Sequence, residues 1–299
     1  MRFAYDDDQV AFRDAVRDLL AKEPRDARDT WDALVDMGVT SALASEASGG
    51  LGLDEVALVA ILEETGYAAL AFPIVETAMV AAPVGIVGPM VAMADGGLVA
   101  WGDQADVVLT VVDNDLHSSD RNTIRAELCD AIDPLRPVIR LPENARGQLH
   151  VGMARAALDR AALGTAAQLV GLGQAMLDMT VAYVKDRHQF GVPIGSFQAV
   201  KHHLANSVRE LAFARPAVQR AAWSLAAGAP EASRDVSMAK AMASDATAFV
   251  GRQALQCHGA IGYTVEHDLH LYLKRTWALA RSYGDARYHR DLIGRSIGV

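Results

Sequence analysis

The segment from residue 186 to residue 202 places an unusual set of side chains between two long helical patterns. It reads DRHQFGVPIGSFQAVKH and carries one guanidinium (Arg187), two amides (Gln189 and Gln198) and an aromatic ring followed by glycine (Phe190). A planar guanidinium stays protonated and can bind a pyrophosphate through two parallel hydrogen bonds. Amides donate and accept hydrogen bonds, and an aromatic ring can cover the edge of a planar heterocycle. The combination predicts a ligand site, although Arg187 alone could be a surface arginine at a helix end.

A second segment, QCHGAIGYTVE over residues 256–266, has the same character. Gln256 supplies another amide, and Gly259, Ala260 and Gly262 supply small residues in a turn. Backbone N–H groups approach a phosphate closely only where bulky side chains are absent. We therefore expect exposed N–H groups of this turn to face the same ligand. A plain helix–turn–helix corner is the alternative.

Other chemical groups form weaker patterns. His267 and His270 have a spacing that a metal ion could use, but no third ligand is evident, and we predict no metal site. Neither Cys129 nor Cys257 has a nearby His/Asn arrangement of the kind that activates a nucleophilic thiol. Two cysteines so far apart are more typical of a reducing compartment than of a disulfide scaffold, which favours the cytoplasm.

Composition excludes several classes of function. The 299 residues carry a formal net charge of −9, so no broad nucleic-acid surface is expected. No run of about 18 apolar residues is free of charges and of Gly or Pro, and we expect no membrane span. The start, Met1 to Asp8, is too acidic for a secretory signal.

The first part of the chain reads as helices joined by short loops. Residues 8–84 repeat apolar residues at helical spacing, with one helix over Glu55–Leu70 that Asp54 caps. A shorter helix is expected from about Glu76 to Ala82.

Residues 86–148 change to short β-branched runs bounded by Gly, Asp, Asn and Pro, which indicates strands. The predicted strands are Leu98–Trp101, Val107–Val112 and Val138–Leu141. Between them, His117–Asn122 reads as a polar loop.

From about Met153 to the end the pattern is helical again. Two long stretches, 197–225 and 231–257, repeat apolar residues by threes and fours, as in a four-helix bundle. We predict an α+β, mainly α fold of three domains: an N-terminal helical domain (1–85), a small, shortened β domain (86–150) and a C-terminal four-helix bundle (151–299).

This order of helices, strands and helices, together with the two segments, resembles the acyl-CoA dehydrogenase family. Arg187-His188-Gln189-Phe190-Gly191 is similar to its Arg-x-x-Phe-Gly motif, and Gln256 to Gly262 to its Gln-x-x-Gly-Gly-x-Gly motif. The run ALASEASGGLGL, residues 42–53, resembles the loop before its third helix. The resemblance implies FAD, an acyl-CoA substrate and an electron-transfer acceptor. A carboxylate would remove the α proton while hydride leaves the β carbon for the flavin.

The resemblance also assigns cofactor contacts, which in the family reach the FAD of a neighbouring subunit. The assigned residues are Arg187, Gln189, Phe190, Gln198, Gln256, Gly259 and Ala260. Ala260 replaces the second glycine of the family motif, which mildly weakens the expected contact.

The catalytic base of the family is missing from both of its usual positions. Carried over to this chain, they fall at Gly284, in the loop after the penultimate helix, and at Ala161, on the helix before the Arg-x-x-Phe-Gly motif. Neither side chain can take a proton. Asp285 is the one candidate base, with a helix-cap acid as the alternative. Asp159 lies two residues before Ala161, a rotation of about 200° on a helix, so it should not face the same pocket.

Three further residues depart from the family or are ambiguous. Ala162 stands where the family usually has Arg, and Glu266 reads as the start of the next helix. The Glu-Pro-x-x-Gly-Ser loop that cradles the flavin is absent from the strand region. Trp101 is a candidate for the family's Trp-centred strand, with core packing as the alternative.

The chain thus resembles the short subunits of hetero-oligomeric actinobacterial acyl-CoA dehydrogenases. It would complete the FAD site of a full-length sister subunit, in an assembly such as a heterotetramer. Members of this paired kind often act on bulky, steroid-derived acyl-CoAs. Two alternatives remain open: a self-sufficient homo-oligomeric flavoenzyme that uses Asp285 as its base, and a non-catalytic scaffold subunit.

Overall fold

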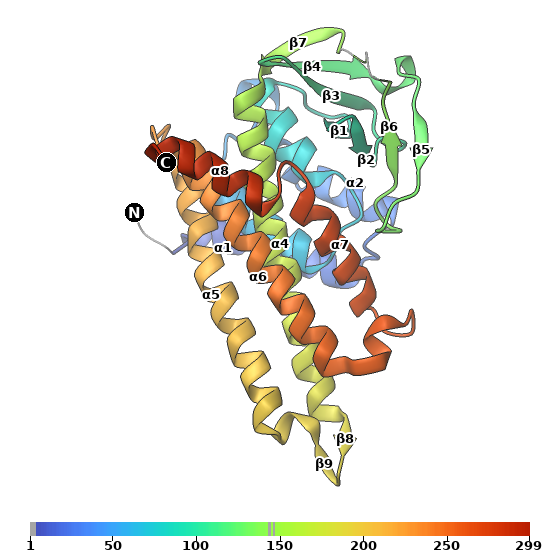
Figure 1. Ribbon diagram of the computed structural model, residues 1–299. Helices are drawn as coiled ribbons and strands as arrows, with labels where there is room; N and C mark the ends of the chain where they lie inside the picture. The colour runs from blue at the N-terminus through green and yellow to red at the C-terminus, as the bar shows by residue number, and fades with distance from the viewer. Residues whose placement is uncertain (1–3, 143–144, 146) are drawn as a thin grey trace.

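Helix α4 (Ala154–Asp186) runs through the centre of the molecule, and the other helices pack around it (Figure 1). This computed structural model describes residues 4–142, 145 and 147–299, so the first three residues of the acidic start lie outside it. Small residues let the neighbouring helices approach closely. A Cβ on Gly171 would lie 1.9 Å from the carbonyl oxygen of Glu63 on α3 (Glu55–Tyr67). The backbones of α3 and α4 are therefore in contact, which a larger residue would prevent.

The predicted C-terminal helices are confirmed. They are α5 (Gln198–Ala226), α6 (Ala232–His258), α7 (Leu269–Arg281) and α8 (Ala286–Ile297). α5, α6 and α7 pack with α4 into the bundle, and α8 packs on α6. Between α4 and α5 a small hairpin, β8 (His188–Gln189) and β9 (Val192–Pro193), projects from one end of the bundle (Figure 1). None of the described helices is both long and apolar enough to cross a membrane.

The N-terminal part is also helical, as predicted. Its α-helices are α1 (Asp7–Lys22), α2 (Arg28–Asp36) and α3. Asp54 caps α3, because its carboxylate accepts the N–H of Ala57 at 3.0 Å. The short predicted helix is η3 (Val75–Ala81), which is a π-helix. The 3-10 helices are η1 (Val39–Ser41), η2 (Glu46–Ser48), η4 (Ala82–Val84), η5 (Arg121–Thr123), η6 (Ile194–Ser196) and η7 (Gly259–Tyr263).

The strand region forms one seven-stranded sheet in the order β5-β6-β2-β1-β3-β4-β7. Strands β1 and β3 pair in parallel, and the other neighbours pair antiparallel. The strands are β1 (Val91–Asp95), β2 (Leu98–Ala100), β3 (Val107–Val112), β4 (Asp115–Asp120), β5 (Glu127–Cys129), β6 (Val138–Arg140) and β7 (Leu149–Met153). The three predicted strands correspond to β2, β3 and β6. The division of the chain at residues 85 and 150 stays a prediction.

The predicted polar loop His117–Asn122 is wrong for most of its length. Its first four residues belong to β4, which pairs with β3 on one side and with β7 on the other. Leu116 and Ser119 of this strand are buried, while His117 and Ser118 are partly exposed. Polar side chains can occupy such a strand because backbone pairing on both sides outweighs their weak β propensity.

Arg275 of α7 joins all three regions of the chain. Its buried guanidinium pairs with Asp133 of the strand region and donates a hydrogen bond of 2.6 Å to the carbonyl oxygen of Leu70, just after α3. The same guanidinium lies 5.3 Å from the ring centroid of Trp101. The indole N–H of Trp101 donates to the carbonyl oxygen of Leu135 at 3.1 Å. Trp101 is therefore a core residue, packed beside a buried cation.

We expect Asp133→Asn to lower the free energy of unfolding by about 3–5 kcal/mol, because Arg275 would keep a buried charge without its counter-ion. Asp32→Asn is a matched control, since the Asp32–Arg28 pair is exposed and should contribute less than about 1 kcal/mol. Urea denaturation followed by circular dichroism measures both losses. Equal losses in the two variants would contradict the role given to Arg275.

Candidate functional site

The β8–β9 hairpin presents the first motif. Phe190 and Gly191 form its turn with φ angles of 54° and 81°, as a two-residue hairpin turn requires. A residue with a side chain rarely adopts such a φ angle, so Phe190 is held in a strained conformation with 92% of its surface exposed. Arg187 and Gln189 are exposed beside it, and Gln198 is exposed at the start of α5.

The second motif lies at the same end of the bundle. α6 ends at His258, whose ring stacks on that of Tyr183 in the last turn of α4, with centroids 4.4 Å apart. Gln256, Gly259 and Ala260 are exposed at this end. Folding thus brings together two motifs that are far apart in the sequence.

One expectation about the second motif is wrong. The N–H of Gly259 is not free for a phosphate, because it donates to the carbonyl oxygen of Leu255 at the end of α6. Gly259 instead contributes open space. Its φ angle of 64° favours glycine, and no atom lies within 4 Å of where a Cβ would be.

The seven predicted cofactor contacts fit a dinucleotide that approaches from outside the chain. All seven residues are exposed, so their donors and acceptors face solvent. A guanidinium, three amides, an aromatic ring and an uncovered turn match the needs of a pyrophosphate and the ring system next to it. In the part of the chain that the structure describes, the hairpin projects beyond the end of the bundle and no other helix or strand extends past it (Figure 1).

Helix α4 separates the hairpin end of the bundle from the Gly284 loop, one of the two positions of the family's base. Arg187 follows the last residue of α4, whereas the Gly284 loop shares a cavity with Leu158 and Asp159 of its first turns. The 33 residues of α4 span about 50 Å at the usual helical rise. A dinucleotide bound at the hairpin cannot extend to the Gly284 loop of the same chain.

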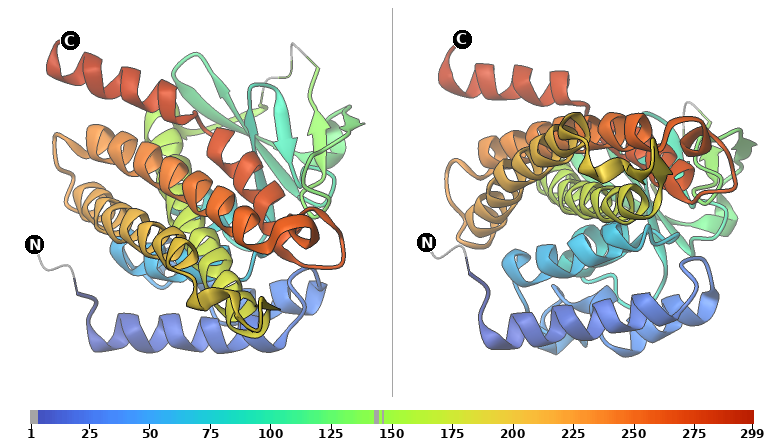
Figure 2. Two further views of the ribbon diagram at one scale, coloured as in Figure 1. Left: turned by 60° about the horizontal axis from the view of Figure 1, so that its bottom comes forward. Right: turned by 90° about the horizontal axis from the view of Figure 1, so that it is seen from below.

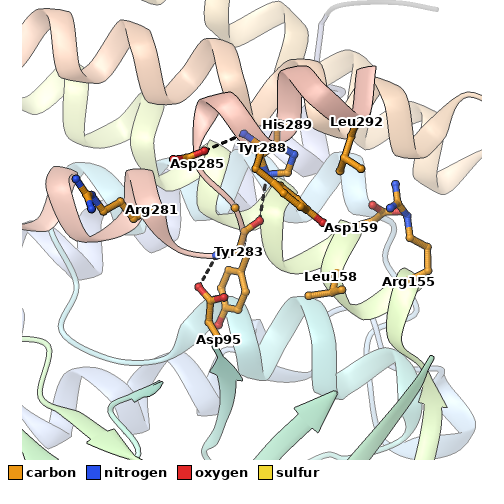
Figure 3. A pocket seen from close by; sticks show the side chains of 11 residues that line it. Asp95, Arg155, Leu158, Asp159, Arg281, Tyr283, Asp285, Tyr288, His289 and Leu292 are labelled. Atoms are coloured by element: carbon orange, nitrogen blue, oxygen red, sulfur yellow. Dashed lines mark hydrogen bonds and ion pairs between the residues drawn. The ribbon is translucent and has the colours of Figure 1, made fainter. Parts of the chain in front are cut away.

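A cavity of about 530 Å³ lies beside Gly284 (Figure 3). Its lining residues are Asp95, Arg155, Leu158, Asp159, Arg281, Tyr283, Gly284, Asp285, Tyr288, His289 and Leu292. Gly284 has a φ angle of 99°, and a Cβ there would lie 2.3 Å from Cδ1 of Tyr288. This loop therefore has no room for the glutamate that the family carries at this position.

Asp285 lies at the N-cap of α8. Its carboxylate accepts the N–H of Tyr288 at 2.8 Å, as expected for a helix-cap acid (Figure 3). This hydrogen bond lowers the pKa of Asp285, which makes the carboxylate a weaker proton acceptor than an ordinary aspartate.

Asp159 lines the cavity beside Gly284, whereas Ala161 is completely buried and does not line it. The two side chains therefore do not face the same pocket, as their spacing on the helix predicts. The carboxylate of Asp159 accepts hydrogen bonds from Ser233 and, at 3.1 Å, from Arg155. Burial raises its pKa. The Asp159 carboxylate is thus held by hydrogen bonds to neighbouring side chains of this chain.

Lys240 of α6 stabilises the Gly284 loop, although sequence patterns do not single it out. The completely buried ammonium donates to the carbonyl oxygens of Gly284 at 2.9 Å and Ala280 at 3.1 Å, and so caps the end of α7. Burial lowers the pKa of Lys240 to about 7. The one available signal is a lysine on the apolar stripe of a predicted helix, a place that charged residues usually avoid.

Glu76 and Tyr283 form a second buried pair at this loop. The Tyr283 hydroxyl donates to Oε1 of Glu76 at 2.6 Å, and burial raises the pKa of Glu76. Tyr283 borders the cavity, but Glu76 does not. The Glu76 carboxylate is therefore shielded from any ligand in the cavity.

The segment before α7 also differs from expectation. Glu266 does not begin the next helix, because Asp268 is the N-cap of α7. The ring of His267 packs edge-on against the ring of His258, with centroids 4.6 Å apart. Among the residues that the structure describes, no group of three or more His, Cys, Asp or Glu side chains is placed to hold a metal ion.

Comparisons with known proteins identify the family of this chain. Residues 6–93 match the acyl-CoA dehydrogenase N-terminal domain, and residues 151–298 match the acyl-CoA dehydrogenase C-terminal domain. Acyl-CoA dehydrogenase IpdE2 of Mycolicibacterium smegmatis is 33% identical over 288 residues, which cover 92% of this chain and 89% of that protein.

Solved structures share the fold. The ChsE4–ChsE5 complex from Mycobacterium tuberculosis has a TM-score of 0.84 and 23% identity, covering 100% of this chain and 99% of that chain. Butyryl-CoA dehydrogenase from Megasphaera elsdenii has a TM-score of 0.81 and 20% identity, covering 100% of both chains.

We expect Lys240→Met to change the pH dependence of stability. With a pKa of about 7 in the folded protein and about 10.4 in the unfolded chain, Lys240 binds fewer protons in the native state between these values. It therefore costs stability as the pH falls from about 10 to 7, so the variant should gain relative to the parent toward pH 7. Urea denaturation across this range checks the difference. A difference that stays constant would contradict the lowered pKa.

We expect Gly284→Ala to lower the free energy of unfolding by at least about 2 kcal/mol, because strain at a positive φ angle adds to overlap with Tyr288. Gly96→Ala is the matched control, since Gly96 has a φ angle of 57° but open space around it. Thermal unfolding measures both variants. If the change at Gly284 costs no more than the change at Gly96, the loop has room for a side chain.

Proposed function

This chain belongs to the acyl-CoA dehydrogenase family of FAD-dependent oxidoreductases, and we propose that it is the short subunit of a hetero-oligomeric member. In this role it completes the FAD site of a full-length sister subunit, which carries the flavin ring and the catalytic glutamate. The observation that carries the proposal is the separation of about 42 Å along α4, from Asp159 beside the Gly284 loop to Arg187 among the exposed cofactor contacts. FAD at the hairpin serves the reaction centre of another chain.

The contribution of this chain is binding and orientation. The family reaction is α,β-dehydrogenation of an acyl-CoA thioester, in which bound FAD accepts the hydride. Arg187 would neutralise the pyrophosphate, and its fork of donors would fix the direction of the cofactor. Gln189, Gln198 and Gln256 would satisfy further oxygen atoms, and Phe190 would shield the ligand from water.

The surroundings of the carboxylates near the Gly284 loop support the proposal that this chain supplies no catalytic base. Asp285 caps a helix, and its pKa is lowered by that hydrogen bond. Asp159 is bound by Arg155 and Ser233, and Glu76 is shielded in the core. Proton abstraction in the assembly is therefore assigned to the sister subunit.

The substrate class, acceptor and location follow from the family resemblance. We propose a bulky, steroid-derived acyl-CoA as substrate and an electron-transfer protein as acceptor. IpdE2 of Mycolicibacterium smegmatis matches nearly the whole chain, and the fold is shared with the ChsE4–ChsE5 complex of Mycobacterium tuberculosis and with the Tcur3481–Tcur3483 steroid acyl-CoA dehydrogenase. Both cysteines are free, which supports the cytoplasm as the site of action.

One alternative rests on an observation of its own. Asp285 lines the open cavity beside Gly284, so a homo-oligomeric enzyme could use it as a base. Asp285→Asn should leave the activity of the assembled enzyme unchanged if the sister subunit supplies the base. An active assembly of this chain alone that Asp285→Asn inactivates would establish the alternative.

We expect Arg187→Ala to weaken FAD retention by the assembly at least about tenfold, because a charge-assisted hydrogen bond to the pyrophosphate is lost. The chain is co-expressed with a full-length acyl-CoA dehydrogenase subunit from the same organism, and flavin absorbance is followed during dilution and gel filtration. Arg28→Ala, at an exposed arginine on α2, is the control. Equal retention in both variants would support a scaffold without flavin contact.

A further inference from the structure

The loop that joins α6 to α7, residues 259–266, is closed at its base by two histidine rings. His258 is the last residue of α6, His267 stands two residues before the start of α7, and their ring centroids lie 4.6 Å apart. Figure 2 shows this loop at the edge of the bundle, at the end that carries the β8–β9 hairpin. Among residues 259–266 only Gly262 is buried, and Tyr263 exposes 75% of its surface. A loop with so few buried contacts opens easily, so its closure depends on the rings at its base.

Tyr183 of α4 joins this loop to the first motif. Its ring stacks on that of His258 with centroids 4.4 Å apart, and its hydroxyl donates to the carbonyl oxygen of His258 at 3.4 Å. The carbonyl oxygen of Tyr183 accepts the N–H of Arg187 at 2.9 Å. We call Tyr183, His258 and His267 the histidine clasp. The clasp connects the turn at Gly259 to Arg187, and so links the two motifs.

The contacts of His258 favour a neutral ring. Its Nδ1 lies 2.8 Å from the carbonyl oxygen of Ala254, which can only accept, so Nδ1 carries the hydrogen and Nε2 the lone pair. Nε2 is buried and has no hydrogen-bond partner among the residues that the structure describes. A proton added there would give a buried charged ring with an N–H that lacks an acceptor, which costs more than an unused lone pair. Stacking on Tyr183 favours a charged ring but supplies no acceptor. His258 therefore stays neutral while the clasp is closed.

The α7 side of the clasp also favours a neutral His258. Nδ1 of His267 accepts the N–H of Leu269 at 3.1 Å, so a second proton on the His267 ring would break this bond. Asp268 follows His267 in the chain, but its carboxylate already pairs with Arg25 at 3.0 Å. Burial lowers the pKa of His258 more than its backbone hydrogen bond raises it, and the neighbouring His267 lowers it further.

We propose that the histidine clasp is a pH-sensitive closure of the second motif, in which neutral His258 holds residues 259–266 closed and protonated His258 releases them. In the open loop His258 is in water, where its pKa returns to about 6.5. Only the open form then binds the proton, so opening should become about tenfold more favourable as the pH falls from about 7.5 to about 5.5. Gly259 and Ala260 are proposed cofactor contacts, so opening would also withdraw them from FAD, a consequence that rests on the proposed function.

Hydrogen exchange of this chain alone tests the closure. The amides of Leu269 and Thr264 are bonded to His267 and to Ile261, so both lose protection when the loop opens. Once corrected for the intrinsic exchange rate, their protection should fall at least about tenfold between about pH 7.5 and about pH 5.5. His258→Phe keeps an aromatic ring in the clasp but cannot bind a proton, so it should reduce this fall by about tenfold.

A control and a second readout complete the test. His150→Phe is the matched control, because His150 is exposed on β7, outside the clasp, and this variant should keep the fall of the parent. Circular dichroism verifies that both variants fold. A titration followed by NMR needs no variant, since the ring signals of His258 should change over the same pH range as the protection of Leu269. Unchanged protection in the parent, an equal fall in His258→Phe, or a His258 ring that titrates while Leu269 stays protected would overturn the proposal.

FAD retention separates the clasp from the cofactor site. The assembly with a full-length acyl-CoA dehydrogenase subunit from the same organism is compared at the two pH values, with the parent chain and with His258→Phe. Loss of FAD at the lower pH in the parent assembly, with less loss in the variant, supports both the closure and its contact with the cofactor. Protection that falls while FAD is retained contradicts the proposed contacts at Gly259 and Ala260 and leaves the closure established by hydrogen exchange.

Discussion

The backbone contact between α3 and α4 fixes the central helix on which the rest of the structure depends. A Cβ on Gly171 would overlap the backbone of α3, so the two helices can pack this closely only because a glycine stands there. With its 33 residues held in the core, α4 keeps the two ends of the molecule about 50 Å apart. The proposed cofactor contacts lie at one end, and the Gly284 loop, where the family resemblance places a base, lies at the other. Under the proposed function, a chain with this geometry shares its cofactor with a neighbouring subunit.

The loop at Gly284 is held in a conformation that favours glycine. Gly284 adopts a φ angle that favours glycine, and the ring of Tyr288 lies where a side chain would begin. Lys240 holds the loop from the bundle side, and the Tyr283–Glu76 pair ties it to the π-helix η3. These contacts hold the loop in one conformation, and the Glu76 carboxylate is used in one of them. The conformation of this loop therefore depends on several contacts and not on Gly284 alone.

Local patterns in the sequence predicted much of the fold but not the tertiary burial of polar groups. The long C-terminal helices and the Asp54 cap followed from apolar periodicity and capping chemistry, and the structure confirms them. Strand β4 was missed because its residues are mostly polar, and a polar run does not reveal that the strand pairs with a neighbour on each side. Lys240 and Glu76 were missed because their burial depends on helices distant in sequence. The two motifs were predicted to act together, and the stacking of Tyr183 on His258 explains how they become neighbours.

The ratio of FAD to protein in the purified assembly tests the central claim most directly. If this chain supplies only the outer contacts of a site that the sister subunit holds, FAD should be absent from the isolated chain and should amount to one molecule for each pair of unlike subunits. Quantitative flavin absorbance after denaturation, combined with the subunit ratio from gel densitometry, gives this number. One FAD for every chain, or a flavin bound by this chain alone, would contradict the account.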